Sequence, residues 1–286
     1  RFKALADGDK YVLTKLMTMS AVDFLKLWFE SDRLIGPVSV SGIIGTFLGV
    51  RSPGTAYVLL HHYMGEIDGA FRSWGFSKGG TGGVSLACAG AARSFGAELR
   101  TEAAVEKIIV REGKAAGVVV RGGHEIKCNT VISAADAHQT FFKLVGEKHL
   151  DADFVQQLKR FKYRGSSAKV NLAVDRLPDF SSKPGEGPHL RGDITIAPGV
   201  EYLEKAYDDA KYGDFSARPF LDIVIPSLTD PTVAPPGKHV ISIFVQYAPY
   251  HLKEGAAQWP AKREALGDTV VDTLAEYCPN LKDSIL

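Results

Sequence analysis

The chain has 286 residues, of which 45% are hydrophobic, so it can build a sizeable core in one large domain or two ordinary ones. Its 34 Lys and Arg residues are balanced by 33 Asp and Glu residues, which gives a formal net charge of +1. Such a balance provides no general field for holding nucleic acid or an anionic membrane surface. We therefore expect no nucleic acid among its partners.

The cysteine content excludes two further classes of protein. Cys88, Cys128 and Cys278 are odd in number and form no C-x-x-C pair, which argues against a disulfide framework and a structural zinc site.

No apolar run approaches the roughly 20 residues that cross a bilayer, so we expect no membrane span. An intracellular protein, cytoplasmic or, in a eukaryote, mitochondrial, is the resulting expectation. The missing initiator Met and the abrupt end after a helical pattern predict a fragment of a longer protein.

The first quarter of the chain has a helical pattern. Ser20 and Asp23 form an acidic variant of the capping box, and apolar residues then recur at helical spacing. We expect Gly36 and Pro37 to end that run. The apolar stretch 57–60 fits a buried helix or a strand, and periodicity does not decide between them.

The middle of the chain alternates between helix and strand patterns. Four glycines at 79, 80, 82 and 83 precede a helix at 84–95 whose small residues suit close packing against a sheet. Short β-branched runs separated by glycine turns then predict a β-meander and one return strand. The expected strands are 105–110, 116–120, 125–128 and 130–134.

The last part of the chain predicts a second sheet with helices. Val170, Leu172 and Val174 alternate with more polar neighbours, as in a strand with one buried face. The expected strands are 169–174, 193–196, 221–225 and 240–247, and the expected helices are about 154–161, 200–211 and 260–277.

Few residues carry a specific chemical pattern. The run from Lys78 to Gly83 leads into a helix, where backbone N–H groups can hold an anion, but Ser85 stands at the third glycine of a G-x-G-x-x-G pattern. A packing role for these glycines therefore stays open beside a phosphate role. The side chains of His61 and His62 point apart, and Glu66 is the one Cys or carboxylate residue at ligand spacing, so we expect no metal site. No G-x-S-x-G serine-hydrolase motif is present.

Several separated segments resemble one known family in the same order. Segments 74–80, 95–102, 105–108, 117–120 and 131–134 are similar to the phytoene-dehydrogenase-like FAD oxidoreductases of the amine-oxidase flavoprotein superfamily. The flanking segments 53–62, 171–178 and 230–237 resemble the branch called pyridine nucleotide-disulphide oxidoreductase domain-containing proteins. The chain departs from the family at Ser77 and Thr81, where relatives usually carry Pro and often Met.

The resemblance implies an α/β (α+β) fold made of a partial FAD-binding domain with a β-meander and a substrate domain of mixed β-sheet and helices. The expected parts are a helical part of the substrate domain at 1–74, a remnant of the FAD-binding domain at 75–140, and the rest of the substrate domain at 141–286. In this family the dinucleotide fingerprint would precede Arg1 and the segment that closes over the flavin would follow Leu286. The resemblance therefore implies that FAD is bound by the full-length parent and that the fragment alone is inactive.

The resemblance also implies a set of cofactor-binding residues. The main chain of Val105 would exchange hydrogen bonds with the FAD adenine, and the small side chains of Ser133 and Ala134 would leave room for the nucleotide. Gly79 and Gly80 would form the turn by which the chain re-enters the FAD domain. No catalytic acid or base is carried over. The implied reaction is hydride transfer from an apolar or amine-like small-molecule substrate to flavin N5, in which the protein supplies orientation and a dry pocket.

The candidate substrate pocket rests on strand alternation alone. If one face of the later strands packs on helices, Asn171, Ser242, Phe244 and Gln246 would share the opposite face, over which relatives place a cavity. The alternative is that these four side chains are solvated or packed among their neighbours and line no pocket.

A non-catalytic module that binds a hydrophobic ligand or a protein partner is the second functional hypothesis, and a homodimer formed through exposed apolar faces is a third.

Overall fold

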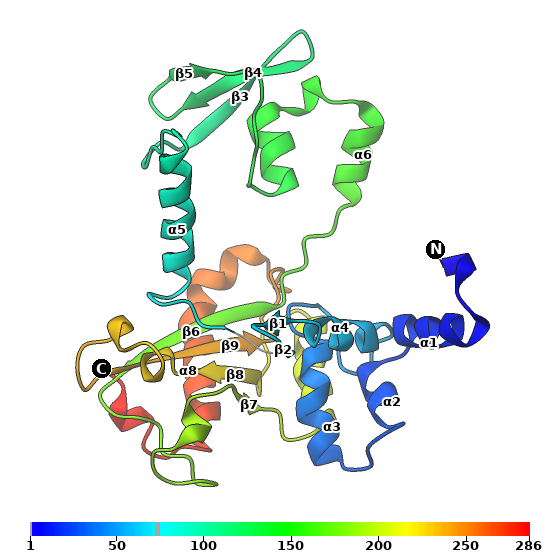
Figure 1. Cartoon of the computed structure of the whole chain (residues 1–286), viewed down its shortest axis with the longest axis vertical. Helices are drawn as coiled ribbons and strands as arrows, with labels where there is room; N and C mark the ends of the chain where they lie inside the picture. Colours follow the sequence, from blue (N-terminus) through cyan, green and yellow to red (C-terminus); the bar gives the residue numbers. More distant parts are fainter. Residues whose placement is uncertain (1, 72–74) are drawn as a thin grey trace. The chain divides into compact units, whose positions relative to one another are not determined.

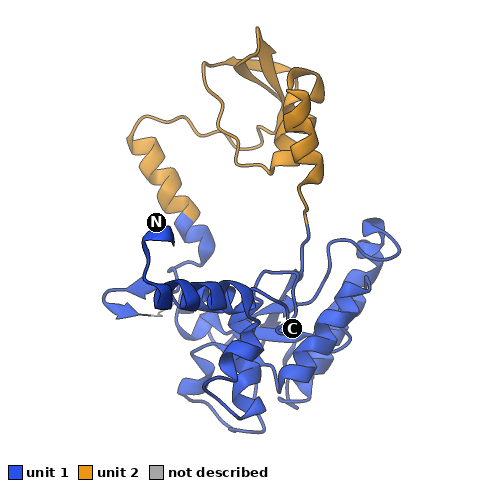
Figure 2. Cartoon of the chain, turned by 90° about the vertical axis from the view of Figure 1, so that its right-hand side faces the viewer, with its two compact units in different colours: residues 1–84, 164–286 blue, residues 85–163 orange. Residues whose placement is uncertain are grey.

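The structure is a computed structural model that describes residues 2–71 and 75–286. The chain divides into two compact units, one made of residues 1–84 and 164–286 and the other of residues 85–163 (Figure 2). The expected domain boundaries at 74/75 and 140/141 stay a prediction. Trp74, which contributes to the family resemblance, lies outside the described residues.

The first unit is built on a four-stranded sheet with the order β6-β9-β8-β7 (Figure 1). Its strands are β6 (Ser167–Val174), β7 (Ile194–Ile196), β8 (Phe220–Val224) and β9 (His239–Gln246). All pairings are antiparallel, so the sheet in the described residues lacks the parallel pairs of the mixed sheet we expected. A parallel pair needs a neighbouring strand of the same direction, and no two adjacent strands here share one.

One face of this sheet forms the main core. Ile241, Ile243 and Val245 of β9 are fully buried and pack with Val270 and Leu274 of the long helix α8 (Trp259–Ala275). The alternation predicted for β6 is confirmed, because its even-numbered residues are half-buried or buried and its odd-numbered residues are exposed. The same period places polar side chains on the opposite face of the sheet.

Helices from both ends of this unit form a second core. They are α2 (Ala21–Leu25), α3 (Asp32–Ser39), α4 (Thr55–His62) and α7 (Val200–Lys211). The helix α1 (Asp7–Thr18) precedes them and has no buried residue, and the small hairpin β1 (Glu66–Ile67) and β2 (Ala70–Phe71) follows α4. The predicted cap of α2 is confirmed, since the Asp23 amide donates to Ser20 Oγ at 3.0 Å. The stretch 57–60 is helical.

The expectation that Gly36 and Pro37 end a helix is wrong. Helix α3 includes both residues and continues to Ser39. Proline lacks the N–H that would bond the carbonyl four residues earlier and its ring crowds that carbonyl, and the helix ends two residues later, so few turns are affected. Gly36 serves a packing role, because a Cβ at this position would lie 2.8 Å from Gly199 Cα at the start of α7.

The second unit holds the predicted meander. Strands β3 (Val105–Arg111), β4 (Lys114–Val120) and β5 (His124–Lys127) pair antiparallel in the order β3-β4-β5. Gly117 in β4 has a φ of 153°, and a Cβ there would clash with Ile126 O, so the close pairing with β5 requires glycine. A π-helix labelled η3 (Gln139–Val145) and the helix α6 (Ala152–Arg160) complete this unit.

The helix α5 (Thr81–Ser94) forms close to its predicted bounds and spans the division between the units. None of its residues is buried, so the expected packing of its small-residue face against a sheet does not occur in the described residues. The return strand expected at 130–134 is wrong as well, since this segment has no regular structure. A strand exists only with a partner, and the described sheets offer none to this segment.

The α/β (α+β) fold class is confirmed by these elements. None of the helices in the described residues combines the length and the apolar character needed to cross a lipid bilayer.

Candidate functional site

The main chain of Val105 has a free side. Strand β3 is an edge strand, and its pairing with β4 places Val105 opposite Val120. The Arg121 amide donates to Ala104 O at 2.8 Å, so the carbonyl before Val105 faces β4. Because main-chain groups alternate in direction along a strand, the N–H and C=O of Val105 face away from β4. Its main chain is therefore open to a hydrogen-bonding partner on that side.

Ser133 is held near the same strand. Its Oγ lies 2.8 Å from Thr140 Oγ1, and Thr140 is a buried residue of η3, which packs against β3. Thr140 Oγ1 also lies within hydrogen-bonding distance of Ala135 O, at 3.2 Å, which ties the irregular segment to the helix. Ala134, the other small residue singled out in the sequence, is exposed. Both residues have small side chains.

Gly79 and Gly80 belong to the other compact unit. Their φ values of 77° and 73° lie in the left-handed region that favours glycine. The Gly79 amide donates to Asp230 Oδ2 at 2.6 Å. Hydrogen bonds from the Thr232 side chain and the Gly79 amide hold the pKa of Asp230 below its usual value. The glycine turn thus binds a carboxylate from a distant loop, and that loop starts the 3-10 helix η7 (Pro231–Val233).

The strand register brings two of the candidate substrate residues together. Asn171 and Ser242 are directly paired across β6 and β9, and Ser242 Oγ donates to Asn171 Oδ1 at 3.0 Å. Phe244 lies on the same face, two residues further along β9, with its ring 6.4 Å from that of Phe220. These positions remain candidates for the substrate pocket.

Gln246 shares that face but has a different environment. Its side chain is fully buried, and its Nε2 donates to Ile43 O at 2.9 Å and to Thr46 O at 3.0 Å. The Gly45 amide donates to its Oε1 at 3.3 Å. The amide therefore has protein partners on both of its ends and joins the sheet to the segment after α3.

Asp222 is a functional candidate that the sequence analysis missed. Its Cα partner on β9 is Phe244, whose own partner on β6 is Lys169, so the three side chains form one row across the sheet face. Burial, followed by hydrogen bonding with Asp193 and the charge of that residue, raises the pKa of Asp222 to about 8. Its buried Oδ1 has no hydrogen-bond partner among the described residues. The signal in the sequence was a single acidic residue inside the run Leu-Asp-Ile-Val-Ile, but its neighbours follow only from the register.

The remaining titratable groups provide little catalytic chemistry. No cluster of His, Cys, Asp and Glu side chains within residues 2–71 and 75–286 could hold a metal ion. Burial raises the pKa of the Cys278 thiol to about 12, which makes it a packing residue of the core. The arrangement therefore resembles a framework for a cofactor more than a constellation of catalytic side chains.

Comparison with known proteins identifies the family. The family model described as "Flavin containing amine oxidoreductase" matches residues 30–284. The chain is 37% identical over 279 residues to "Pyridine nucleotide-disulfide oxidoreductase domain-containing protein 2" of Rattus norvegicus, an alignment that covers 95% of this chain and 48% of that protein. It is 27% identical over 220 residues to "Phytoene desaturase (lycopene-forming)" of Pseudescherichia vulneris, covering 75% of this chain and 42% of the relative.

A solved structure shares the fold. The crystal structure of an oxidoreductase from Methanosarcina mazei superposes with a TM-score of 0.61 at 19% sequence identity, over 97% of this chain and 59% of that one. The chain spans about half the length of the curated relatives it matches. Since the family model covers most of the sequence, the chain belongs to the flavin containing amine oxidoreductase family.

Proposed function

We propose that this chain is the middle part of an FAD-dependent oxidoreductase that moves a hydride from a small organic substrate to the flavin. Family membership carries the proposal. When bound, FAD supplies the hydride acceptor, and the protein supplies binding, orientation and exclusion of water. The substrate class we propose is an apolar or amine-like molecule.

The residues beside the edge of β3 fit a nucleotide in their chemistry. Among the residues that the structure describes, the N–H and C=O of Val105 have no partner on the side away from β4, and they match the donor and acceptor edge of an adenine ring. Ser133 and Ala134 carry small side chains, and Ser133 is fixed through Thr140. We propose that these three residues hold the adenine end of FAD and that Gly79 and Gly80 form the turn through which the chain re-enters the cofactor-binding part.

The polar face of the β6-β9-β8-β7 sheet is the proposed substrate side. Asn171 and Ser242 provide a hydrogen-bonded pair, and Phe244 provides an aromatic surface between Lys169 and Asp222. Such a combination of one ring and a few oriented polar groups is typical of small-molecule sites. Gln246 would act there through the backbone it holds, because its amide has protein partners.

The cofactor content of the longer protein tests the proposal. We expect the purified longer protein to be yellow, to absorb near the flavin bands, and to release FAD on acid denaturation at close to one per chain. A colourless protein that stays colourless after reconstitution with FAD would contradict the proposal and favour the binding module. Anaerobic bleaching of the flavin bands by candidate apolar and amine substrates then identifies the substrate class.

A further inference from the structure

Strand β6 has an edge that is only partly used. It is the outermost strand of its sheet, and within the described residues a second partner meets it only at its last residues. There, Val174 and Ile285 form an antiparallel bridge, and the Leu286 amide donates to Ala173 O at 3.0 Å. The Asp175 amide donates to Ser284 O at 2.9 Å. The last residues of the chain thus begin a ladder on this edge.

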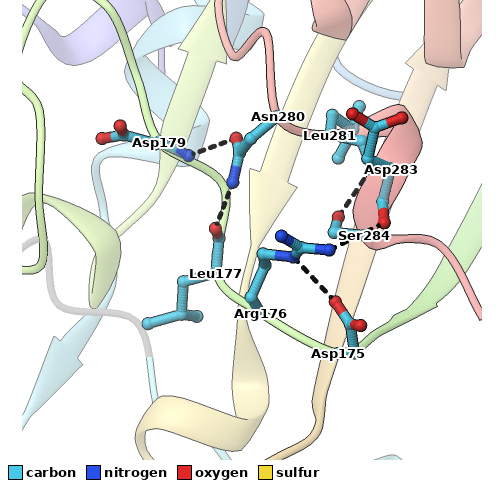
Figure 3. Close-up of polar contacts among 8 residues, drawn as sticks. All are labelled: Asp175, Arg176, Leu177, Asp179, Asn280, Leu281, Asp283 and Ser284. Atoms are coloured by element: carbon cyan, nitrogen blue, oxygen red, sulfur yellow. Dashed lines mark hydrogen bonds and ion pairs between the residues drawn. The ribbon is translucent and has the colours of Figure 1, made fainter.

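Polar contacts hold the residues before this ladder against the loop that follows β6 (Figure 3). Arg176 Nη2 donates to Asp283 O at 3.0 Å, just beyond the end of β6. Asn280 Nδ2 donates to Leu177 O at 2.9 Å, and Asn280 Oδ1 accepts from the Asp179 amide at 2.8 Å. The loop after β6 is therefore bound at several points to the turn that follows α8.

We call the contacts of Arg176, Leu177 and Asp179 with Asn280 and Asp283 the clamp. After the clamp, the backbone continues in an extended conformation. Ile285 has φ −71° and ψ 131°, which lie in the extended region of backbone conformations, near polyproline II. An antiparallel continuation from Leu286 would run from Ala173 back towards Ser167. Because Ala173 O already faces this side, the main-chain groups of Asn171 and Lys169 face it too, by the alternation of a strand. Those outward groups are the hydrogen-bonding positions of the free edge.

A groove lies along the same edge. Two adjoining open cavities of about 600 and 500 Å³ lie between β6 and α8, and both are lined by Val170 and Gly267. Ile285 lines the first cavity, at the clamped end of the groove. Gly267 is in the middle of a helix, where glycine is unfavourable, and a Cβ there would meet nothing within 4 Å. The groove is therefore open at the point where a chain beside β6 would pass α8.

We propose that the free edge of β6 receives a fifth strand, antiparallel to β6, from the stretch of the longer protein that follows residue 286. This strand fills the groove between β6 and α8 and closes the sheet on that side. The match covers 48% of the rat relative, so a protein of that length would have chain available for this role. The clamp, the extended backbone at Ile285 and the groove point to the same path.

Residue-resolved amide exchange tests this proposal without any substitution. In a chain that ends at Leu286, the outward amides of Lys169 and Asn171 should exchange about 100-fold or more faster than those of Val170 and Leu172, which face β9. In the longer protein the four amides should be similarly slow. Equally fast exchange at Lys169 and Asn171 in both proteins would overturn the proposal. So would slow exchange in the shorter chain that depends on its concentration, because a second copy would then occupy the edge.

A cross-link identifies the occupant. By the register, Leu172 should face the first residue after Leu286 at a distance that suits a disulfide. We expect Leu172→Cys, paired with a cysteine at that following position in a Cys88→Ser background, to give a disulfide-linked peptide detectable by mass spectrometry. Linkage of Leu172→Cys to any other segment, or the absence of a link in a folded protein with protected Asn171, would contradict the assignment.

Filling the groove provides an independent test. Gly267→Leu should leave a chain ending at Leu286 folded, but should restore fast exchange at Asn171 in the longer protein. Ala265→Leu, at an exposed position of α8 outside the groove, is the matched control and should change neither. Unchanged protection of Asn171 in the folded Gly267→Leu protein would count against a strand in the groove.

Discussion

The amide of Gly79 donates to Asp230 Oδ2 at 2.6 Å and so links two loops that are 151 positions apart in the sequence. Asp230 Oδ1 accepts from the amide and the hydroxyl of Thr232. One carboxylate therefore holds the glycine turn before α5 and the start of η7. The segments 74–80 and 230–237 both contribute to the family resemblance, and this hydrogen bond joins them in the folded chain.

Removing this carboxylate should release the glycine turn. We expect Asp230→Ala to lower the protection factor of the Gly79 amide, and protonation of Asp230 at acid pH to do the same once the intrinsic exchange rate at each pH is divided out. A lowered pKa means that the contribution is present above the ordinary value of 3.8 and is lost as the pH falls through the folded value. Thr232→Val, which removes only the hydroxyl bond to Oδ1, is the control and should leave Gly79 protected. Unchanged exchange in Asp230→Ala would show that the bond does not hold the turn.

Asp222 should make stability depend on pH in the opposite direction. Its pKa is raised from 3.8 to about 8, so between these values the folded state binds a proton that the unfolded state has lost. The free energy of unfolding should therefore fall as the pH rises through this window. Asp222→Asn should flatten the dependence and add on the order of 3 kcal/mol at pH 8 and above.

Denaturant unfolding across pH 4 to 9 measures this effect. Asp193→Asn is an informative companion, because Asp193 contributes to the raised pKa of Asp222, whereas Lys169 opposes it. We expect the Asp193 variant to reduce the slope only in part. Identical slopes for the wild-type protein and Asp222→Asn would contradict the burial of this carboxyl.

Gln246 should matter for stability more than its polar neighbours on the sheet. Replacing it with Leu keeps most of the volume but removes a donor from the carbonyls of Ile43 and Thr46 and the acceptor of the Gly45 amide, while Ile43 O keeps its bonds from Thr46. We expect a loss of about 1–3 kcal/mol in the free energy of unfolding. Ser242→Ala, which removes a bond to the exposed Asn171, should stay within about 0.5 kcal/mol. Equal losses in the free energy of unfolding of the two variants would show that the hydrogen bonds of Gln246 stabilise the fold no more than the bond of Ser242 does.

The proposed nucleotide contacts predict a contrast between two side chains. Since Val105 would act through its main chain, Val105→Ala should leave FAD binding by the longer protein within about threefold of wild type. Ala134→Leu should weaken binding about tenfold or more, equivalent to about 1.4 kcal/mol, because the added volume takes the space of the nucleotide. Fluorescence titration of the apoprotein measures both. The reverse order of effects would contradict this assignment of roles.

Local patterns predicted most of the secondary structure. The alternation of Val170, Leu172 and Val174 predicted the buried face of β6, and the helix expected at 200–211 forms at those bounds. The segment 130–134 has the composition of a strand, but a strand requires a neighbour, and pairing is not a local property. Pro37 predicts a helix stop, but α3 tolerates it near its C-terminal end, where only the last turn is affected.

The candidate site was less accessible to sequence reasoning. Asn171 and Ser242 could be placed on one face by counting, but their direct pairing follows only from the register of β6 and β9. Asp222 could not be found in this way, because its link to Lys169 and Asp193 depends on the order of three strands. The binding of Gly79 by Asp230 likewise depends on how distant loops meet.

The central claim is that the free side of Val105 takes the nucleotide of FAD. The most direct measurement is amide exchange at Val105 in the longer protein, with FAD bound and after FAD removal. FAD should slow exchange at Val105 about tenfold or more and leave the β4-paired amide of Arg121 unchanged. Exchange at Val105 that is the same in the two states would contradict the account.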